Sequence, residues 1–152
     1  MFSPSRDQAR RFLFDAWGKY RAGAPLEPLE AVAVRVISLH PEYHPLLEDA
    51  DRNLERDYGP EHGGLNPFLH ISLHLAIEEQ LAIDQPLGIV RSYRLLAARL
   101  GDEHAAKHIL LECLGETIWN AQRSGSAPDG AAYLRCIEAQ LAGNDKGSTA
   151  PR

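Results

Sequence analysis

The chain has 152 residues, of which 44% are hydrophobic, and a formal net charge of −5. This length suits one domain with a buried core, and the acidic balance without any Lys/Arg run argues against a nucleic-acid partner. No apolar stretch approaches the roughly 20 residues that span a bilayer, and the N-terminus lacks a signal-peptide pattern. We therefore expect a cytoplasmic protein with no membrane partner.

Two helices are predicted at the start of the chain. Ser5 and Gln8 form a capping-box pattern ahead of an apolar stripe that stops near Gly23. Pro28 suits a first helical position, and the run from there to Leu39 is apolar almost all round. The second helix should therefore be buried.

Prolines then interrupt the helical pattern. His40 precedes Pro41, and a residue before proline is pushed out of helical geometry, so the second helix should end there. A short helical piece is expected over residues 44–49. The following polar, glycine-containing stretch over residues 50–65 predicts a long loop.

Four more helices are predicted in the second half, each bounded by caps, glycines or prolines. They are expected over residues 67–83, 87–100, 103–124 and 129–141. Residues 143–152 are small and polar and predict a disordered tail. Since no segment alternates with period two, the sequence predicts an all-α, up-and-down bundle of about six helices, forming a single domain over residues 1–142.

The two cysteines, Cys113 and Cys136, are isolated in the sequence and lack CxxC spacing. This arrangement favours free thiols in a reducing compartment over a disulfide framework. Neither thiol is expected to be catalytic.

The spacing His-x-x-x-His-x-x-x-Glu occurs three times and uses six of the seven histidines. The triplets are His40/His44/Glu48, His70/His74/Glu78 and His104/His108/Glu112. Four residues are slightly more than one helical turn, so each triplet lines one side of a helix. Imidazole and carboxylate are common ligands of zinc and non-haem iron. The pattern predicts a transition-metal site; apart from Glu48, whose alignment Pro45 disturbs, its ligands are expected to be His40, His44, His70, His74, Glu78, His104, His108 and Glu112.

The predicted connections also bring the triplets together. The helices that begin at Pro67 and Glu103 are separated by one helix with short links, so they should run parallel with both histidine pairs near their N-terminal ends. The end of the second helix, at His40, is expected at the same end of the bundle as these histidine pairs. Because buried imidazoles without partners would cost about 1–3 kcal/mol each, metal ligation is the expected solution.

Four segments resemble a known family. They are FSPSRDQARRFLFDAWGKYRAG, HPEYH, NPFLHISLHLAIEEQLAIDQP and RLGDEHAAKHILLECLGE. Together they are similar to a proteobacterial family of short uncharacterised proteins, a domain of unknown function, over the chain up to about residue 140. The resemblance implies a bacterial cytoplasmic protein and no established activity. The site pattern is also similar to that of hemerythrins, whose di-iron site uses HxxxE and HxxxH helices, which His74/Glu78 and the pairs His70/His74 and His104/His108 match.

Three functional hypotheses follow. The first is a non-haem di-iron protein that binds, activates or senses oxygen species, with the histidines of the second and third triplets as terminal ligands and their glutamates bridging or capping the ions. Iron is preferred, but zinc, manganese and nickel also accept nitrogen and oxygen ligands. The second is a mononuclear zinc- or nickel-dependent enzyme, and the third is an interaction module with a structural metal. The sequence names no substrate and leaves catalysis and oligomeric state open.

Overall fold

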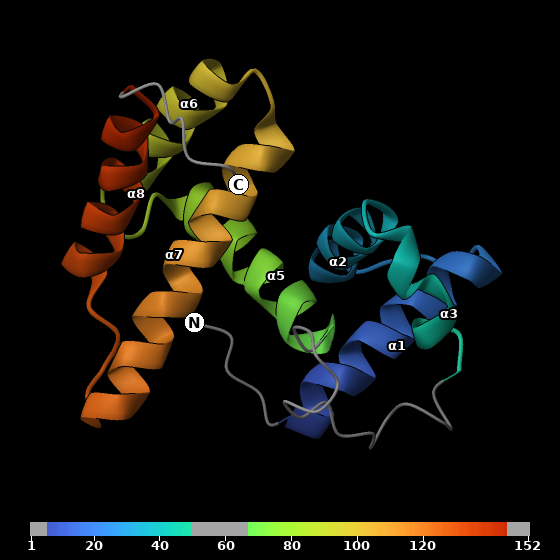
Figure 1. The fold of residues 1–152 in the computed structure, drawn as a ribbon. Helices are drawn as coiled ribbons and strands as arrows, with labels where there is room; N and C mark the ends of the chain where they lie inside the picture. The colour runs from blue at the N-terminus through green and yellow to red at the C-terminus, as the bar shows by residue number, and fades with distance from the viewer. Residues whose placement is uncertain (1–5, 50–66, 146–152) are drawn as a thin grey trace. The chain divides into compact units, whose positions relative to one another are not determined.

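The computed structural model describes residues 6–49 and 67–145. These residues form seven α-helices and one short 3₁₀ turn, with no strand among them, which confirms the predicted all-α bundle (Figure 1). None of the described helices is both long and apolar enough to cross a membrane. The loop expected over residues 50–65 lies outside the described residues.

The chain forms two compact units, Met1–Ala76 and Ile77–Arg152, so the boundary falls within one helix. The first unit contains α1 (Arg6–Ala22), α2 (Pro28–Ser38), the 3₁₀ turn η1 (Pro41–Tyr43), α3 (His44–Leu47) and the first part of α5 (Pro67–Ile83). The second unit contains the rest of α5, α6 (Ile89–Leu100), α7 (Glu103–Ser124) and α8 (Gly130–Asp145).

The start of α2 follows the sequence signals closely. Pro28 occupies the first turn, and Glu27 and Glu30 form a reciprocal capping box. The Glu30 carboxylate also binds the Lys19 ammonium of α1 at 2.8 Å. This hydrogen bond and charge pairing lower the pKa of Glu30 and raise that of Lys19. Glu30 therefore joins α1 to α2 and also accepts a hydrogen bond from a backbone N–H at the start of α2.

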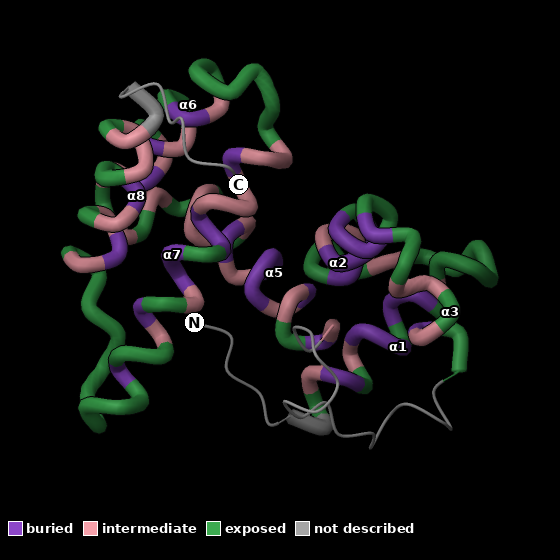
Figure 2. Tube along the Cα trace, viewed as in Figure 1, coloured by how far each residue is buried: buried purple, intermediate pink, exposed green. Residues whose placement is uncertain are grey.

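An apolar core holds the first unit together, and Figure 2 shows it as buried stretches on α1, α2 and α5. Trp17 on α1 is only 4% exposed within this core. Burial of such side chains contributes about 1.5–3 kcal/mol each, so the core is the main force that fixes these helices. Its buried members are Leu13, Phe14, Ala16, Trp17, Ala33, Val34, Val36, Ile37, Leu47, Phe68, Ile71 and Leu75.

In the second unit, aspartates cap the N-termini of α7 and α8. Asp102 accepts hydrogen bonds from the backbone of His104 and Ala105, and Asp129 does the same at the start of α8. Helix α8 continues to Asp145, so the first three residues of the expected tail are helical. Residues 146–152 lie outside the described part of the chain.

The expectation of two free thiols is wrong, because Cys113 and Cys136 form a disulfide between α7 and α8. Helix α7 ends at Ser124 and is followed by Gly125, which has a positive φ of 66°, and α8 packs against α7. The two Cα atoms are 5.7 Å apart although 23 positions separate the residues. This distance suits a disulfide, and only the folded helix pair creates it.

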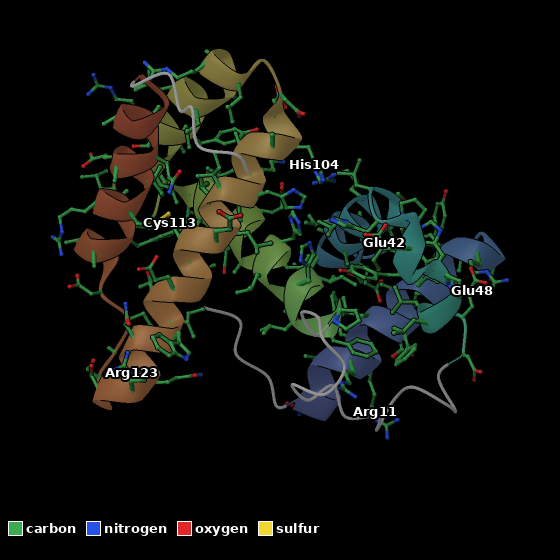
Figure 3. The ribbon with its side chains drawn as sticks, viewed as in Figure 1. Arg11, Glu42, Glu48, His104, Cys113 and Arg123 are labelled. Atoms are coloured by element: carbon green, nitrogen blue, oxygen red, sulfur yellow. A yellow bond between two sulfur atoms is a disulfide. The ribbon has the colours of Figure 1, made fainter. Side chains whose placement is uncertain are left out.

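Farther along α7, Trp119 is 56% exposed. The guanidinium of Arg123, which Figure 3 labels, lies 4.4 Å from its ring centroid. This contact suits a cation–π interaction at the surface. The two tryptophans of the chain therefore occupy opposite environments.

Candidate metal centre

Three histidines of the first unit lie close together. His40 follows α2, whereas His70 and His74 lie one turn apart on α5. One nitrogen from each of the three rings lies within 4.8 Å of the others. The three are called the histidine cluster below.

The spacing within the histidine cluster suits a single metal ion. The Nε2 atoms of His40 and His70 are 3.3 Å apart. Ligand nitrogens bound tetrahedrally at about 2.0–2.1 Å from an ion are separated by about 3.3–3.4 Å. The ring centroids of the three residues are also mutually close, at 4.8–4.9 Å. A small movement of the side chains would thus complete a three-nitrogen site.

Local structure orients His40 for this role. Its Nδ1 donates a hydrogen bond at 2.9 Å to the carbonyl of Val36 in the last turn of α2, which also accepts from the backbone N–H of Leu39. A proton on Nδ1 makes Nε2, which lies 3.3 Å from His70 Nε2, the acceptor nitrogen of the His40 ring. Metal-binding histidines are commonly fixed in this way through their other nitrogen. His40 is 4% exposed, so the ring is held in a protected position.

Beside its contacts with His40 and His70, His74 adjoins the apolar core. This residue is 2% exposed, and its neighbours Ile71 and Leu75 on α5 belong to the buried core. His70, one turn earlier, is half-buried. The site therefore has one deeply buried side and one side nearer the solvent.

Tyr43 packs against the histidine cluster. Its ring stacks on His40 with a centroid distance of 5.6 Å and an interplanar angle of 10°, and it meets His70 edge-on. Burial, together with Glu42, raises the pKa of the Tyr43 hydroxyl. The phenol therefore stays neutral at physiological pH and forms a wall of the site.

Two members of the first predicted triplet lie outside the histidine cluster. The Nε2 atom of His44 donates to the carbonyl of Ile37 at 2.9 Å, and the His44 ring packs on Trp17 with 4.5 Å between centroids. Glu48, which Figure 3 labels, is exposed beside α3 and accepts a hydrogen bond from Trp17 Nε1. These residues fasten the segment after α2 to α1. They do not share the face of His40 because η1 replaces a regular helical turn between them.

The third predicted triplet lies in the second unit. The rings of His104 and His108 meet in a T-shaped contact with 4.3 Å between centroids. Glu112 is exposed. In the same unit, Glu78 forms an ion pair with Lys107, with 2.6 Å between Glu78 Oε2 and Lys107 Nζ. The convergence of this histidine pair with His70 and His74 stays a prediction from the sequence.

Comparison with known proteins identifies a family. A family model described as "Domain of unknown function (DUF1841)" matches residues 5–139. Since this range covers most of the chain, the protein belongs to that family, and the expected membership of an uncharacterised family is confirmed. No curated protein and no solved structure matches the chain.

Proposed function

We propose that this member of the DUF1841 family binds a transition-metal ion through His40, His70 and His74. The observation that supports the proposal is the approach of three ring nitrogens, from two separate segments, to within 4.8 Å of one another. Three protein ligands are typical of metal sites that keep a further position for water or substrate. The proposed function is therefore reversible binding of a small ligand at an accessible metal.

The composition of the ligand set favours one ion at this site. The histidine cluster offers imidazole nitrogens, whereas Glu48 binds Trp17 and Glu78 pairs with Lys107. A di-iron centre of the carboxylate type needs glutamates that bridge two ions. Imidazole ligation suits iron, zinc and nickel alike. Iron would supply affinity for oxygen species, and zinc would supply a water molecule that is acidic at neutral pH.

A di-iron site remains the second candidate, because α7 repeats the histidine spacing and brings His104 and His108 into ring contact. This reading retains the resemblance to hemerythrins and assigns bridging or capping roles to Glu78 and Glu112. It differs from the first candidate in the number of ions per chain.

Elemental analysis of untagged protein tests the proposal. The expected result is about one equivalent of a transition metal per chain, and two equivalents would favour the di-iron candidate. Two results together would refute metal binding. The protein, purified without a chelator, would contain less than about a tenth of an equivalent of metal, and it would take up no added Fe²⁺, Zn²⁺ or Co²⁺. Visible absorption then distinguishes iron from zinc, since bound zinc has no absorption bands in the visible range.

Access to the metal is tested with Co²⁺, whose visible bands respond to its ligands. Azide added to the Co²⁺-loaded protein is expected to shift these bands, because a site with three protein ligands would leave a fourth position for a small anion. Unchanged bands, together with a melting temperature that rises strongly on Co²⁺ binding, would assign the ion a structural role instead.

A further inference from the structure

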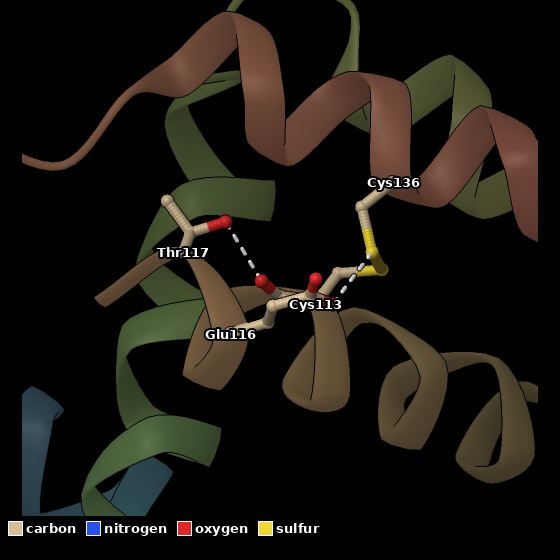
Figure 4. The surroundings of a disulfide bond; sticks show 4 residues. All are labelled: Cys113, Glu116, Thr117 and Cys136. Carbon is tan, nitrogen blue, oxygen red and sulfur yellow. Dashed lines mark hydrogen bonds between the residues drawn. A yellow bond between two sulfur atoms is a disulfide. The ribbon is translucent and has the colours of Figure 1, made fainter. Parts of the chain in front are cut away.

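A cavity adjoins the disulfide in the second unit. Its volume is about 270 Å³, and its lining includes Glu116 and Asn120 of α7, Asp129 and Cys136. A water molecule occupies about 30 Å³ in the liquid, so the cavity has room for a molecule of several non-hydrogen atoms. Figure 4 shows the disulfide between the two helices with Glu116 beside it.

The two sulfur atoms differ in accessibility. Cys113 is 1% exposed, whereas Cys136 is half-buried and lines the cavity. Thiol–disulfide exchange requires a thiolate to reach one sulfur atom of the pair. A molecule in the cavity can reach Cys136, and Cys113 is then the leaving group.

The electrostatic character of the cavity is negative near the accessible sulfur. The Glu116 Oε2 atom lies 3.9 Å from Cys136 Sγ, and Asp129 adds a second carboxylate to the lining. The described lining contains no Lys, Arg or His. A positive charge on an incoming thiol would therefore be attracted, and a negative one repelled, at the position where the reaction occurs.

We propose that this cavity is a site of thiol–disulfide exchange selective for small thiols that carry a positive charge, such as aminothiols. The thiolate sulfur of the small molecule attacks Cys136 Sγ and forms a new S–S bond. The bond between Cys136 and Cys113 breaks, and its electron pair goes to the Cys113 sulfur, which takes up the proton that the small thiol released. The small thiol is oxidised to a mixed disulfide, Cys113 is reduced, and the covalent link between α7 and α8 opens.

The test compares three small thiols of different charge: cysteamine, 2-mercaptoethanol and 2-mercaptoethanesulfonate. Each reacts with the folded full-length protein at equal thiolate concentration, and its rate is divided by its rate with the neutral bis(2-hydroxyethyl) disulfide. The normalised rates are expected to fall in that order, by about 3-fold or more at each step at low salt. Peptide mass spectrometry should find the mixed disulfide on Cys136.

Two variants provide the matched comparison. Glu116→Gln should reduce the spread among the three thiols by at least about half, since it removes the nearest charge. Glu138→Gln removes the charge of an exposed glutamate on α8 outside the cavity and should leave the spread unchanged. Equal normalised rates in the wild type, adducts mainly on Cys113, or rates that rise with urea in parallel with unfolding would each overturn the proposal.

Discussion

The two units use the same histidine spacing in different settings. On α5, His70 and His74 meet a third histidine, His40, beside an apolar core. On α7, the rings of His104 and His108 contact each other, and the glutamate of that triplet is exposed. The spacing places residues on one side of a helix, but the surrounding elements decide what that side can bind.

The units also differ in what holds their helices together. The first has a contiguous apolar core and the Lys19–Glu30 ion pair. The second adds a covalent bond between α7 and α8. This contrast predicts that replacing a metal-binding histidine has its largest effect in the first unit. Loss of the disulfide should have its largest effect in the second unit.

The largest expected effect comes from comparing His74→Ala with His104→Ala. Removing a group that only orients a metal ligand typically weakens metal binding about 10–100-fold. His74 is proposed as a ligand itself, so His74→Ala should have a larger effect and weaken Co²⁺ binding by about 1,000-fold or more. His104→Ala should change the affinity by less than about 10-fold. Competition with a chromophoric chelator measures both constants. Equal losses in the two variants would contradict the contrast between the histidine pairs.

Removal of the disulfide should be the next largest effect. The double variant Cys113→Ala/Cys136→Ala opens a link between residues 23 positions apart. Chain-entropy arguments give a loss of about 3 kcal/mol in the free energy of unfolding of the second unit. Urea titration measures this loss, while Co²⁺ affinity should stay within about 3-fold of the wild type. A large fall in affinity would show that the histidine cluster depends on the α7–α8 link.

A smaller effect, of opposite sign, is expected at Gly115. Among the described residues outside its own helical backbone, a Cβ atom built at this position of α7 would meet no atom within 4 Å, so there is space for a methyl group. Gly115→Ala should stabilise the second unit by about 0.5–1 kcal/mol, because alanine has the higher helix propensity. Thermal unfolding measures the gain, and Gly125→Ala is the control. Gly125 has a positive φ of 66°, so that change should destabilise.

The smallest effect concerns the ion pair of the first unit. The hydrogen bond and charge of Lys19 lower the pKa of Glu30 from 4.5. Glu30 therefore contributes stability that is present above the carboxyl pKa of the unfolded chain and is lost as pH falls through the lower folded-state pKa. Glu30→Gln should lower stability slightly at pH 7, and its difference from the wild type should shrink as the pH falls below 4.5.

The Lys19 side of the pair has the opposite sign. Its pKa is raised above 10.5, so its contribution is full below that value and is lost as pH rises through the folded-state pKa. Urea titrations at several pH values measure both limits. A difference between wild type and Glu30→Gln that stays constant from pH 7 to pH 3 would contradict the ion-pair explanation.

Local signals made much of the helical structure predictable. Pro67 and Asp102 mark the starts of α5 and α7, and Gly125 follows the end of α7, in agreement with the predicted ranges 67–83 and 103–124. Caps and breakers act within a few residues, so the sequence contains them directly. The expected end at Leu141 is too early, since α8 continues to Asp145 through residues mostly of low helix propensity.

Non-local features were predictable only in part. The pairing of His70 and His74 follows from helical periodicity, and their approach to His40 agrees with the expected end of α2. His44 was assigned to the site, but its Nε2–H donates a hydrogen bond to the carbonyl of Ile37 in α2. The disulfide depends on how α8 packs on α7, and no local spacing of Cys113 and Cys136 encodes that.

The contrast between Trp17, at 4% exposure, and Trp119, at 56%, gives each unit its own fluorescent reporter. A buried indole emits at shorter wavelength than an exposed one, and only the exposed one is readily quenched by iodide. Unfolding of the first unit should therefore shift the Trp17 emission to longer wavelength. With iodide present to suppress Trp119, a single urea titration would follow the first unit alone, and the part of the emission that iodide removes would report the second unit, including the effect of disulfide reduction there.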